Sequence, residues 1–172
     1  RLQAVPAVIQ IPVGAGGPES NKPFIGLIDI VKMKALIWQD EELGAKWDEV
    51  DIPADQIDEA NQYRAELLEV IAGSDDEFME KYLANEDITQ DDIKKALRAG
   101  TLAFDFVPIL CGSAFKNKGV QPMLDAVIDF LPSPLDIQAA TGTNAKGDEE
   151  LTRPADENGP FAALAFKIVA DP

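Results

Sequence analysis

The chain has 172 residues, with 31 acidic residues, 15 basic residues and no histidine, so its net charge at neutral pH is −16. This length allows one ordinary domain, or one domain with part of another, and suffices for a hydrophobic core. Apolar residues make up 46% of the chain and charged residues 27%, which argues against extensive disorder. So acidic a chain repels a polyanion, which argues against nucleic acid as a direct ligand and favours a basic protein as partner.

Cys111 is the single cysteine, so an internal disulfide framework and a cysteine-based zinc site are excluded. No apolar run approaches the roughly 18 residues that span a bilayer, and the opening residues do not resemble a signal peptide. We therefore expect a cytoplasmic protein, with an organellar source left open. The chain opens on arginine rather than methionine, which indicates a processed or excised piece.

Four short strands are predicted in the first part of the chain, from β-branched and aromatic runs between turn residues. They cover residues 7–13, 24–31, 35–38 and 46–50, with a turn at 14–18. The short connections favour antiparallel pairing.

Most of the charge lies in one segment, because residues 40–95 hold 19 acidic and 5 basic residues. The pattern there becomes helical, with a predicted helix start near Ala54. The apolar stripe of this helix is Ile57, Ala60, Tyr63, Leu67 and Ile71. At about 100° per residue, the opposite face carries Asp58, Gln62, Ala65 and Glu69.

Two further helices are predicted in the same acidic segment. The first is short and would turn Phe78, Met79, Tyr82 and Leu83 inward. The second would begin at a capping pair, Thr89 and Asp92, and end at Gly100. Its predicted buried residues are Ile93, Ala96 and Leu97.

The run at 106–111 is apolar throughout, as expected of a strand covered on both faces. A loop at 112–119 and a helix at 120–131 follow, and Pro132 and Pro134 end that helix. One parallel-type strand cannot form a sheet alone, so its neighbours are either the earlier strands or lie outside this chain. Residues 141–159 indicate a linker or long loop, and 160–169 a strand that opens a truncated next domain.

Catalytic chemistry finds little support. Without histidine there is no side chain with an ordinary pKa near neutrality to act as general base. The acidic clusters at 75–77 and 91–92 sit at predicted helix starts, where negative charge is favourable without any catalytic role. No calcium-loop or phosphate-loop pattern occurs, and neither Asn-Lys pair, at 21–22 or 117–118, continues to the guanine-selecting aspartate. Cys111 ends an apolar strand and is expected to be an inert thiol.

The loop at 112–119 is more informative, because ligands bind at the carboxyl ends of strands in open α/β folds. By spacing alone, a plain strand-to-helix turn is the alternative. The residues from Cys111 to Pro134 resemble elongation factor G, a translational GTPase, at the end of its GTPase domain. Residues 26–35 and 78–83 resemble the same family, and 160–172 are similar to the start of its second domain, a β-barrel. The resemblance covers nearly the whole chain.

The resemblance implies an α/β fold class: an α+β insert with a small, mainly antiparallel sheet, plus the last strand and helix of a GTPase-type domain. It places the inserted subdomain mainly at 1–105, the end of the GTPase domain at 106–134, a linker at 135–159 and a barrel stub at 160–172. The Ser113, Ala114 and Phe115 loop matches the family's last nucleotide loop, whose backbone helps hold guanine.

The phosphate loop, the switch segments and the Asn-Lys-x-Asp motif of the family would lie upstream of Arg1. The resemblance thus implies a parent that binds GTP and Mg²⁺ and hydrolyses GTP to drive tRNA–mRNA translocation on the ribosome. For this fragment alone it implies no cofactor, no metal, no catalytic residue and no GTP hydrolysis. Whether the parent serves translocation or ribosome recycling stays open.

In the family, a helix of the inserted subdomain contacts the mobile stalk protein of the large ribosomal subunit. The matching outward stripe here is Asp58, Gln62, Ala65 and Glu69, flanked by Asp55 and Glu66. A stalk domain that presents lysine would pair with this face and bind faster. The alternative is a solvated helix face without a partner, as most acidic stripes are.

Two other readings remain open. A free-standing acidic interaction domain predicts a closed fold with a complete sheet. A fragment instead predicts an orphaned 106–111 strand, a mobile tail after Pro134 and an unpaired 161–169 strand, whose exposed edges would favour dimers. A ribosomal-protection protein or a release-factor GTPase would keep the family and change the member.

Overall fold

The computed structural model describes residues 4–17, 19–39, 44 and 46–170, so Pro18 of the predicted turn and Arg1 lie outside the described residues. The chain divides into two compact units, Arg1–Leu131 and Pro132–Pro172. It combines helices with small antiparallel and parallel sheets, so the α/β fold class is confirmed.

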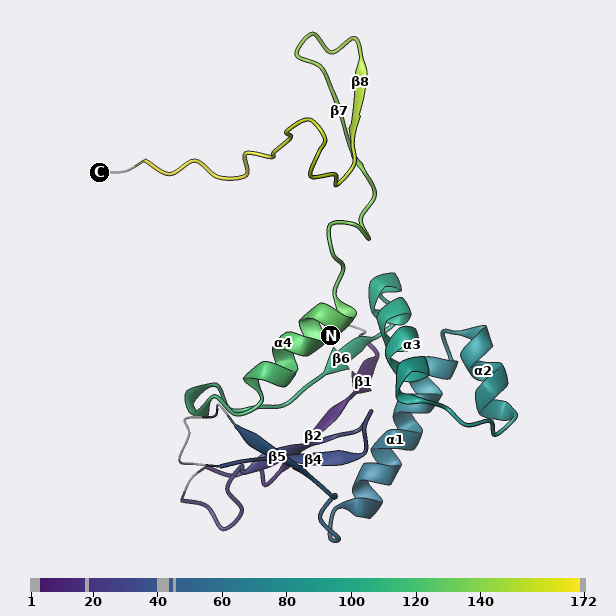
Figure 1. The fold of residues 1–172 in the computed structure, drawn as a ribbon, viewed down its shortest axis with the longest axis vertical. Helices are drawn as coiled ribbons and strands as arrows, with labels where there is room; N and C mark the ends of the chain where they lie inside the picture. The colour runs from purple at the N-terminus through teal and green to yellow at the C-terminus, as the bar shows by residue number, and fades with distance from the viewer. Residues whose placement is uncertain (1–3, 18, 40–43, 45, 171–172) are drawn as a thin grey trace. The chain divides into compact units, whose positions relative to one another are not determined.

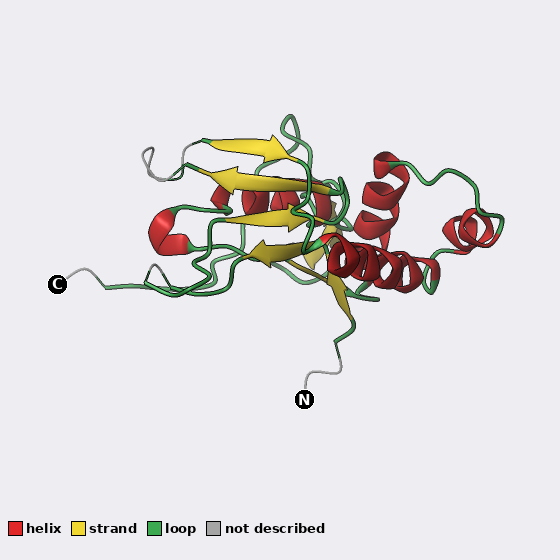
Figure 2. Cartoon of the chain, turned by 90° about the horizontal axis from the view of Figure 1, so that it is seen from below, coloured by secondary structure: helices red, strands yellow, loops and turns green. Residues whose placement is uncertain are grey.

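The first unit contains a four-stranded antiparallel sheet in the order β2 (Gln10–Val13), β3 (Gly26–Asp29), β4 (Lys34–Trp38), β5 (Trp47–Val50). Figure 2 shows these strands side by side. Successive side chains of a strand point to opposite faces, so Ile28 enters the main core while Leu27 joins a smaller cluster with Leu36 and Trp38. Both faces of the sheet are therefore covered.

The predicted strand at 7–13 is two strands, β1 (Pro6–Val8) and β2, with a break at Ile9. β1 pairs in parallel with β6 (Val107–Ile109), whereas β2 pairs with β3. Ile9 joins the two sheets, because its N–H donates to Ile109 and its carbonyl accepts from Ile30. The prediction of an orphaned strand at 106–111 is thus wrong.

β6 also departs from the prediction of a strand covered on both faces. Val107 is 49% exposed and Ile109 40%, while Phe106, directly before the strand, is buried. The continuous apolar run therefore reflects a strand with one face left open in this chain.

Three helices lie together at one end of the sheet: α1 (Ile57–Ala72), α2 (Asp76–Leu83) and α3 (Gln90–Ala103) (Figure 1). The predicted apolar stripe of α1 is confirmed at Ala60, Leu67 and Ile71, which are buried. Ile57 is exposed, since α1 begins there rather than near Ala54. Leu83, predicted to turn inward, is exposed because it is the last residue of α2.

α3 begins at the predicted capping box. Thr89 accepts a hydrogen bond from the Asp92 N–H through its hydroxyl at 3.1 Å, and the Asp92 carboxylate accepts one from the Thr89 N–H at 3.0 Å. Gly100 does not end the helix as predicted, because α3 continues to Ala103 and Phe104 adopts the left-handed conformation after it. A Cβ at Gly100 would clash with the Phe106 ring, so the glycine serves close packing instead of termination.

α4 (Val120–Phe130) follows a short 3-10 turn, η2 (Ala114–Lys116), and ends two residues before Pro132. Lys94 on α3 forms an ion pair with Asp129 on α4, with 2.7 Å between its Nζ and the carboxylate oxygen. Arg98, also on α3, donates to the Asp129 carbonyl at 2.9 Å. These contacts join the acidic helical segment to the helix that follows the loop at 112–119.

The second unit contains a hairpin of β7 (Ala140–Thr143) and β8 (Glu150–Arg153), where a linker was predicted. Asn144 builds its turn, since its Oδ1 accepts from the N–H groups of Lys146 and Asp148, and Gly147 has a positive φ of 75°. The predicted strand at 160–169 is wrong, because residues 160–170 have no regular secondary structure. A strand needs a partner to accept its hydrogen bonds, and no described segment provides one there.

Candidate functional site

The loop after β6 closes on itself through backbone hydrogen bonds. The Ser113 N–H donates to the Lys118 carbonyl at 2.8 Å, and the Lys118 N–H donates back to the Ser113 carbonyl at 3.1 Å. Inside this ring, Asn117 donates to Ala114 at 3.1 Å and adopts a left-handed conformation. The loop is therefore a fixed turn at the carboxyl end of β6.

Two glycines make this turn sterically feasible. A Cβ at Gly112 would lie 2.8 Å from the Lys118 carbonyl oxygen, and one at Gly119 would lie 2.9 Å from the Cys111 carbonyl oxygen. Gly119 also has a φ of +87°, which other residues rarely adopt. The Gly-Ser and Lys-Gly pairs that flank the loop thus fix its shape.

The predicted loop residues differ in exposure. Ala114 and Phe115 are exposed, Ser113 is half-buried and Lys118 is buried. Among the described residues, no backbone hydrogen bond uses the N–H of Ala114 or Phe115. A cavity of about 520 Å³ adjoins the loop, and residues 16–17 and 23–25 form its other wall. The loop can therefore donate backbone hydrogen bonds to a ligand with carbonyl acceptors.

The outward face of α1 is as predicted, because Asp58, Gln62, Ala65 and Glu69 are all exposed. Gln62 donates to the Glu66 carboxylate at 2.9 Å, one turn along the helix. No ion pair within the described part of the chain neutralises Asp58, Glu66 or Glu69. The acidic face is thus available to a basic partner.

Arg64, the single basic residue of α1, does not offset this charge. Its guanidinium turns inward and donates to the carbonyls of Ile30 and Val31 at 2.8 and 2.9 Å. Burial lowers the pKa of this group, and the nearby Asp29 opposes the effect.

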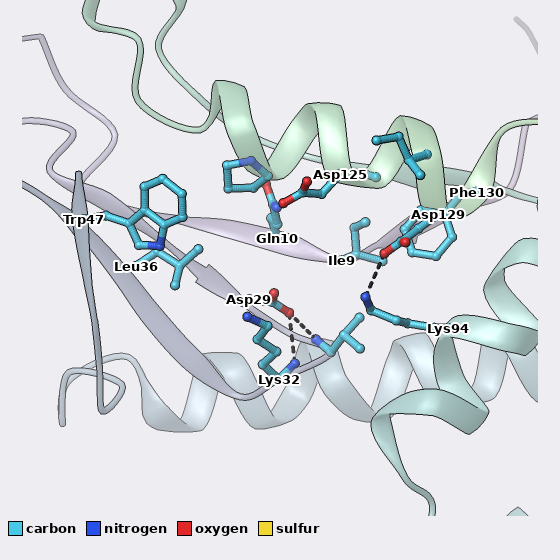
Figure 3. A pocket seen from close by; sticks show the side chains of 14 residues that line it. Ile9, Gln10, Asp29, Lys32, Leu36, Trp47, Lys94, Asp125, Asp129 and Phe130 are labelled. Carbon is cyan, nitrogen blue, oxygen red and sulfur yellow. Dashed lines mark hydrogen bonds and ion pairs between the residues drawn. The ribbon is translucent and has the colours of Figure 1, made fainter. Parts of the chain in front are cut away.

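A cavity of about 270 Å³ lies between the sheet and α4, and sequence reasoning missed it. Figure 3 shows Asp29 and Lys32 on its sheet side, and Asp125 and Asp129 on α4. These residues come from distant parts of the chain, so only the fold brings them together. The single local signal is Asp29, which lies inside the predicted strand at 24–31 although aspartate is uncommon in strands and typical of turns.

The charged groups of this cavity have structural partners. Asp29 accepts from the N–H groups of Val31 and Lys32, both at 2.9 Å, and so closes the β3–β4 turn. Burial raises the pKa of the Asp29 carboxyl, although these two hydrogen bonds and the charge of Lys32 oppose the rise. Lys32 also pairs with Glu49 at 3.2 Å, and Lys94 with Asp129 (Figure 3). The cavity is best explained by the turn and the α3–α4 junction that border it.

Other chemistry is limited in the part of the chain that the structure describes. Burial raises the pKa of the Cys111 thiol to about 11, so its reactive thiolate is scarce at neutral pH. No group of three or more metal-ligating side chains is found among the described residues. Within the same residues, no helix has both the length and the apolar character to cross a membrane.

No protein-family model matches the sequence. Among solved structures, the chain is similar to ttk003000868, a protein from Thermus thermophilus, with a TM-score of 0.64 and 26% sequence identity. The match covers 79% of this chain and 20% of that protein, so the chain spans about a fifth of its length. The designation of that protein states no activity, and the likeness supports the fold described above.

Proposed function

We propose that this chain is part of a translational GTPase of the elongation factor G type, and that it serves there as a non-catalytic piece that binds the ribosomal stalk. Its parent would be a cytoplasmic enzyme that hydrolyses GTP to drive tRNA–mRNA translocation. The motif resemblance at 26–35, 78–83 and 111–134 supports this proposal. So does the likeness of the chain to a fifth of a much longer protein.

The loop at 113–115 fits the base of GTP. Guanine carries a carbonyl oxygen, and the unbonded N–H groups of Ala114 and Phe115 are suitable donors to it. The described residues do not fit the phosphates or Mg²⁺, which require a phosphate loop, a lysine and oxygen ligands. We therefore assign this chain a contact to the base and no step of hydrolysis.

The acidic face of α1 is the observation that carries the stalk-binding role. Exposed carboxylates at Asp58, Glu66 and Glu69 lie on one helix without a basic partner in the described chain. A basic stalk domain would be drawn to this surface and would bind faster at low ionic strength.

A free-standing acidic interaction domain is the second candidate. The pairing of β6 with β1 favours it, whereas the exposed apolar side chains of β6 and α4 argue against it. Apolar side chains are exposed on both β6 and α4, and a finished domain buries most of such side chains. The exposed residues are Val107, Ile109, Met123, Leu124, Val127 and Ile128. Another translational GTPase would share the loop at 112–119 and α4. The sequence at 33–35 and 113–134 favours elongation factor G over such a protein.

Calorimetric titration of the 172-residue chain with the C-terminal domain of the ribosomal stalk protein tests the proposal. We expect binding at low salt that weakens about tenfold or more with Asp58→Lys or Glu69→Lys. Glu80→Lys on α2 is the matched control, because Glu80 is exposed and the charge change is the same. An equal effect of all three variants would indicate a long-range field without a contact at α1, and no binding would contradict the stalk-binding role.

A further inference from the structure

A groove of about 440 Å³ runs between β1 and the acidic helix α1. Its lining is mainly apolar, and two carboxylates, Glu66 and Glu69, stand at its α1 side. The apolar lining residues are Val5, Pro6, Val8, Tyr63, Leu67 and Val70.

The groove exists because β1 is an edge strand. β1 is bonded to β6 along one side, and its sheet has no further described strand. Pro6 has no N–H, which suits an edge that is not extended by another strand. Buried Leu67 closes the bottom, while Val5 keeps 46% of its surface exposed. An apolar slot is thus left open beside the helix.

Part of the charge of α1 lies on the side of the helix that borders this groove. At about 100° per residue, Glu66 and Glu59 lie about 80° and 100° round the helix from Asp58, on the same side as Tyr63 and Val70. Neither acid has a basic partner in the described chain, and Arg64 is held inward by two carbonyls. The slot therefore combines an apolar floor with an uncompensated negative rim.

We propose that this groove binds an amphipathic helix of a basic protein, with an apolar side chain seated between Tyr63 and Val70 and Lys or Arg paired with Glu66 and Glu69. The charge complementarity of the rim selects the basic helix, and the apolar floor gives it a fixed position. The inference deepens the proposed function, because it names the surface and the chemistry of the partner contact, and it rests on that function only in taking the stalk protein as the natural partner.

Two probes test the groove on the 172-residue chain: the stalk C-terminal domain and a designed amphipathic peptide of leucine and lysine. The double variant Val5→Thr, Val70→Thr replaces methyl groups by hydroxyls and keeps shape and charge. We expect it to weaken binding of both probes about tenfold, and Glu66→Lys to do the same. Val127→Thr, at an exposed helical valine on α4, and Glu80→Lys are the matched controls and should leave both affinities within about threefold.

The outcomes separate the groove from the proposed function. If the groove variants lose affinity for both probes while the control variants keep theirs, the inference is supported. Binding of the stalk domain that ignores these variants but falls with Asp58→Lys overturns the groove and leaves the stalk-binding role in place. Binding of the peptide alone, lost in the groove variants, supports the groove and contradicts the stalk protein as partner. Absence of binding by either probe overturns the inference.

Discussion

Gly100 owes its role to Phe106, a residue outside its own helix. Alanine at an interior helical glycine normally stabilises a helix by about 1 kcal/mol, but here the added Cβ would clash with the Phe106 ring. We expect Gly100→Ala to lower the free energy of unfolding by about 1–3 kcal/mol, measured by urea denaturation.

Gly73→Ala is the control for this prediction. A Cβ at Gly73 would lie 3.5 Å from its nearest neighbours, and the residue has a φ of −67° that alanine adopts readily. We expect it to leave stability unchanged or raise it by up to about 1 kcal/mol. Equal effects of the two substitutions would contradict the packing role of Gly100.

Asp29 should make stability depend on pH in an uncommon direction. Burial raises the pKa of its carboxyl in the folded state, so the folded chain holds the proton more tightly than the unfolded chain does. Stability from this group is therefore lost as the pH rises from the ordinary pKa through the raised one. Asp29→Asn keeps an acceptor oxygen for Val31 and Lys32 and cannot ionise, so its stability relative to the natural chain should rise as the pH increases above the ordinary pKa of an aspartyl carboxyl.

Asp51→Asn gives the opposite sign and serves as the control. The hydrogen bond from Lys34, 2.7 Å long, lowers the pKa of the Asp51 carboxyl. Its contribution to stability is present above the ordinary pKa and is lost as the pH falls through the lowered value. Urea unfolding at a series of pH values measures both differences, and parallel curves for Asp29→Asn and the natural chain would contradict the effect assigned to burial.

Among the helices and strands, the sequence pattern predicted those features that depend on interactions between residues close together in the chain. The Thr89–Asp92 capping box and the buried stripe of α1 depend on residues three or four apart, so the sequence could specify them. The hydrogen bonding of Ile9 to both sheets could not be predicted, because it depends on β6, about 100 residues later. The failed strand at 160–169 has the right composition and lacks a partner.

The candidate sites follow the same division. The 113–115 loop and the outward face of α1 are continuous or regularly spaced in sequence. The structure exposes the outward face of α1 as predicted, and it exposes Ala114 and Phe115 of the loop. The groove joins β1 to α1, and the cavity of Figure 3 joins β2, β3, α3 and α4. No spacing rule links such distant segments, so these two features emerged only from the fold.

Arg98 should hold the end of α4 in place. Its guanidinium donates to the carbonyls of Ile128, Asp129 and Leu131, at 3.4, 2.9 and 3.3 Å, where the helix leaves carbonyl groups unpaired. We expect Arg98→Ala to speed amide hydrogen exchange in the last turn of α4 about tenfold. Lys95→Ala, at an exposed position of α3, the helix that carries Arg98, should not. Equal exchange in the two variants would contradict this role.

At the scale of the whole molecule, the two units differ in how they are stabilised. The buried hydrophobic residues of both core clusters all lie between Ala7 and Phe130. The second unit has a hairpin of its own, followed by a segment whose Phe161, Phe166 and Ile168 are about nine-tenths exposed or more. The first unit should therefore hold nearly all of the stability, and the second most of the tendency to associate through exposed apolar side chains.

Two truncations test this division of stability. A chain that ends at Leu131 should unfold at the same urea midpoint as the 172-residue chain, because no buried core residue is removed. A chain that ends at Arg153 keeps the hairpin and loses the exposed apolar segment, so it should scatter less light at high concentration than the 172-residue chain. A lower midpoint in the shorter chain would mean that residues 132–172 contribute to the stability of the first unit. If the chain that ends at Arg153 scatters as much light as the 172-residue chain, the association surface lies on β6 and α4, where Val107, Ile109 and Ile128 are also exposed.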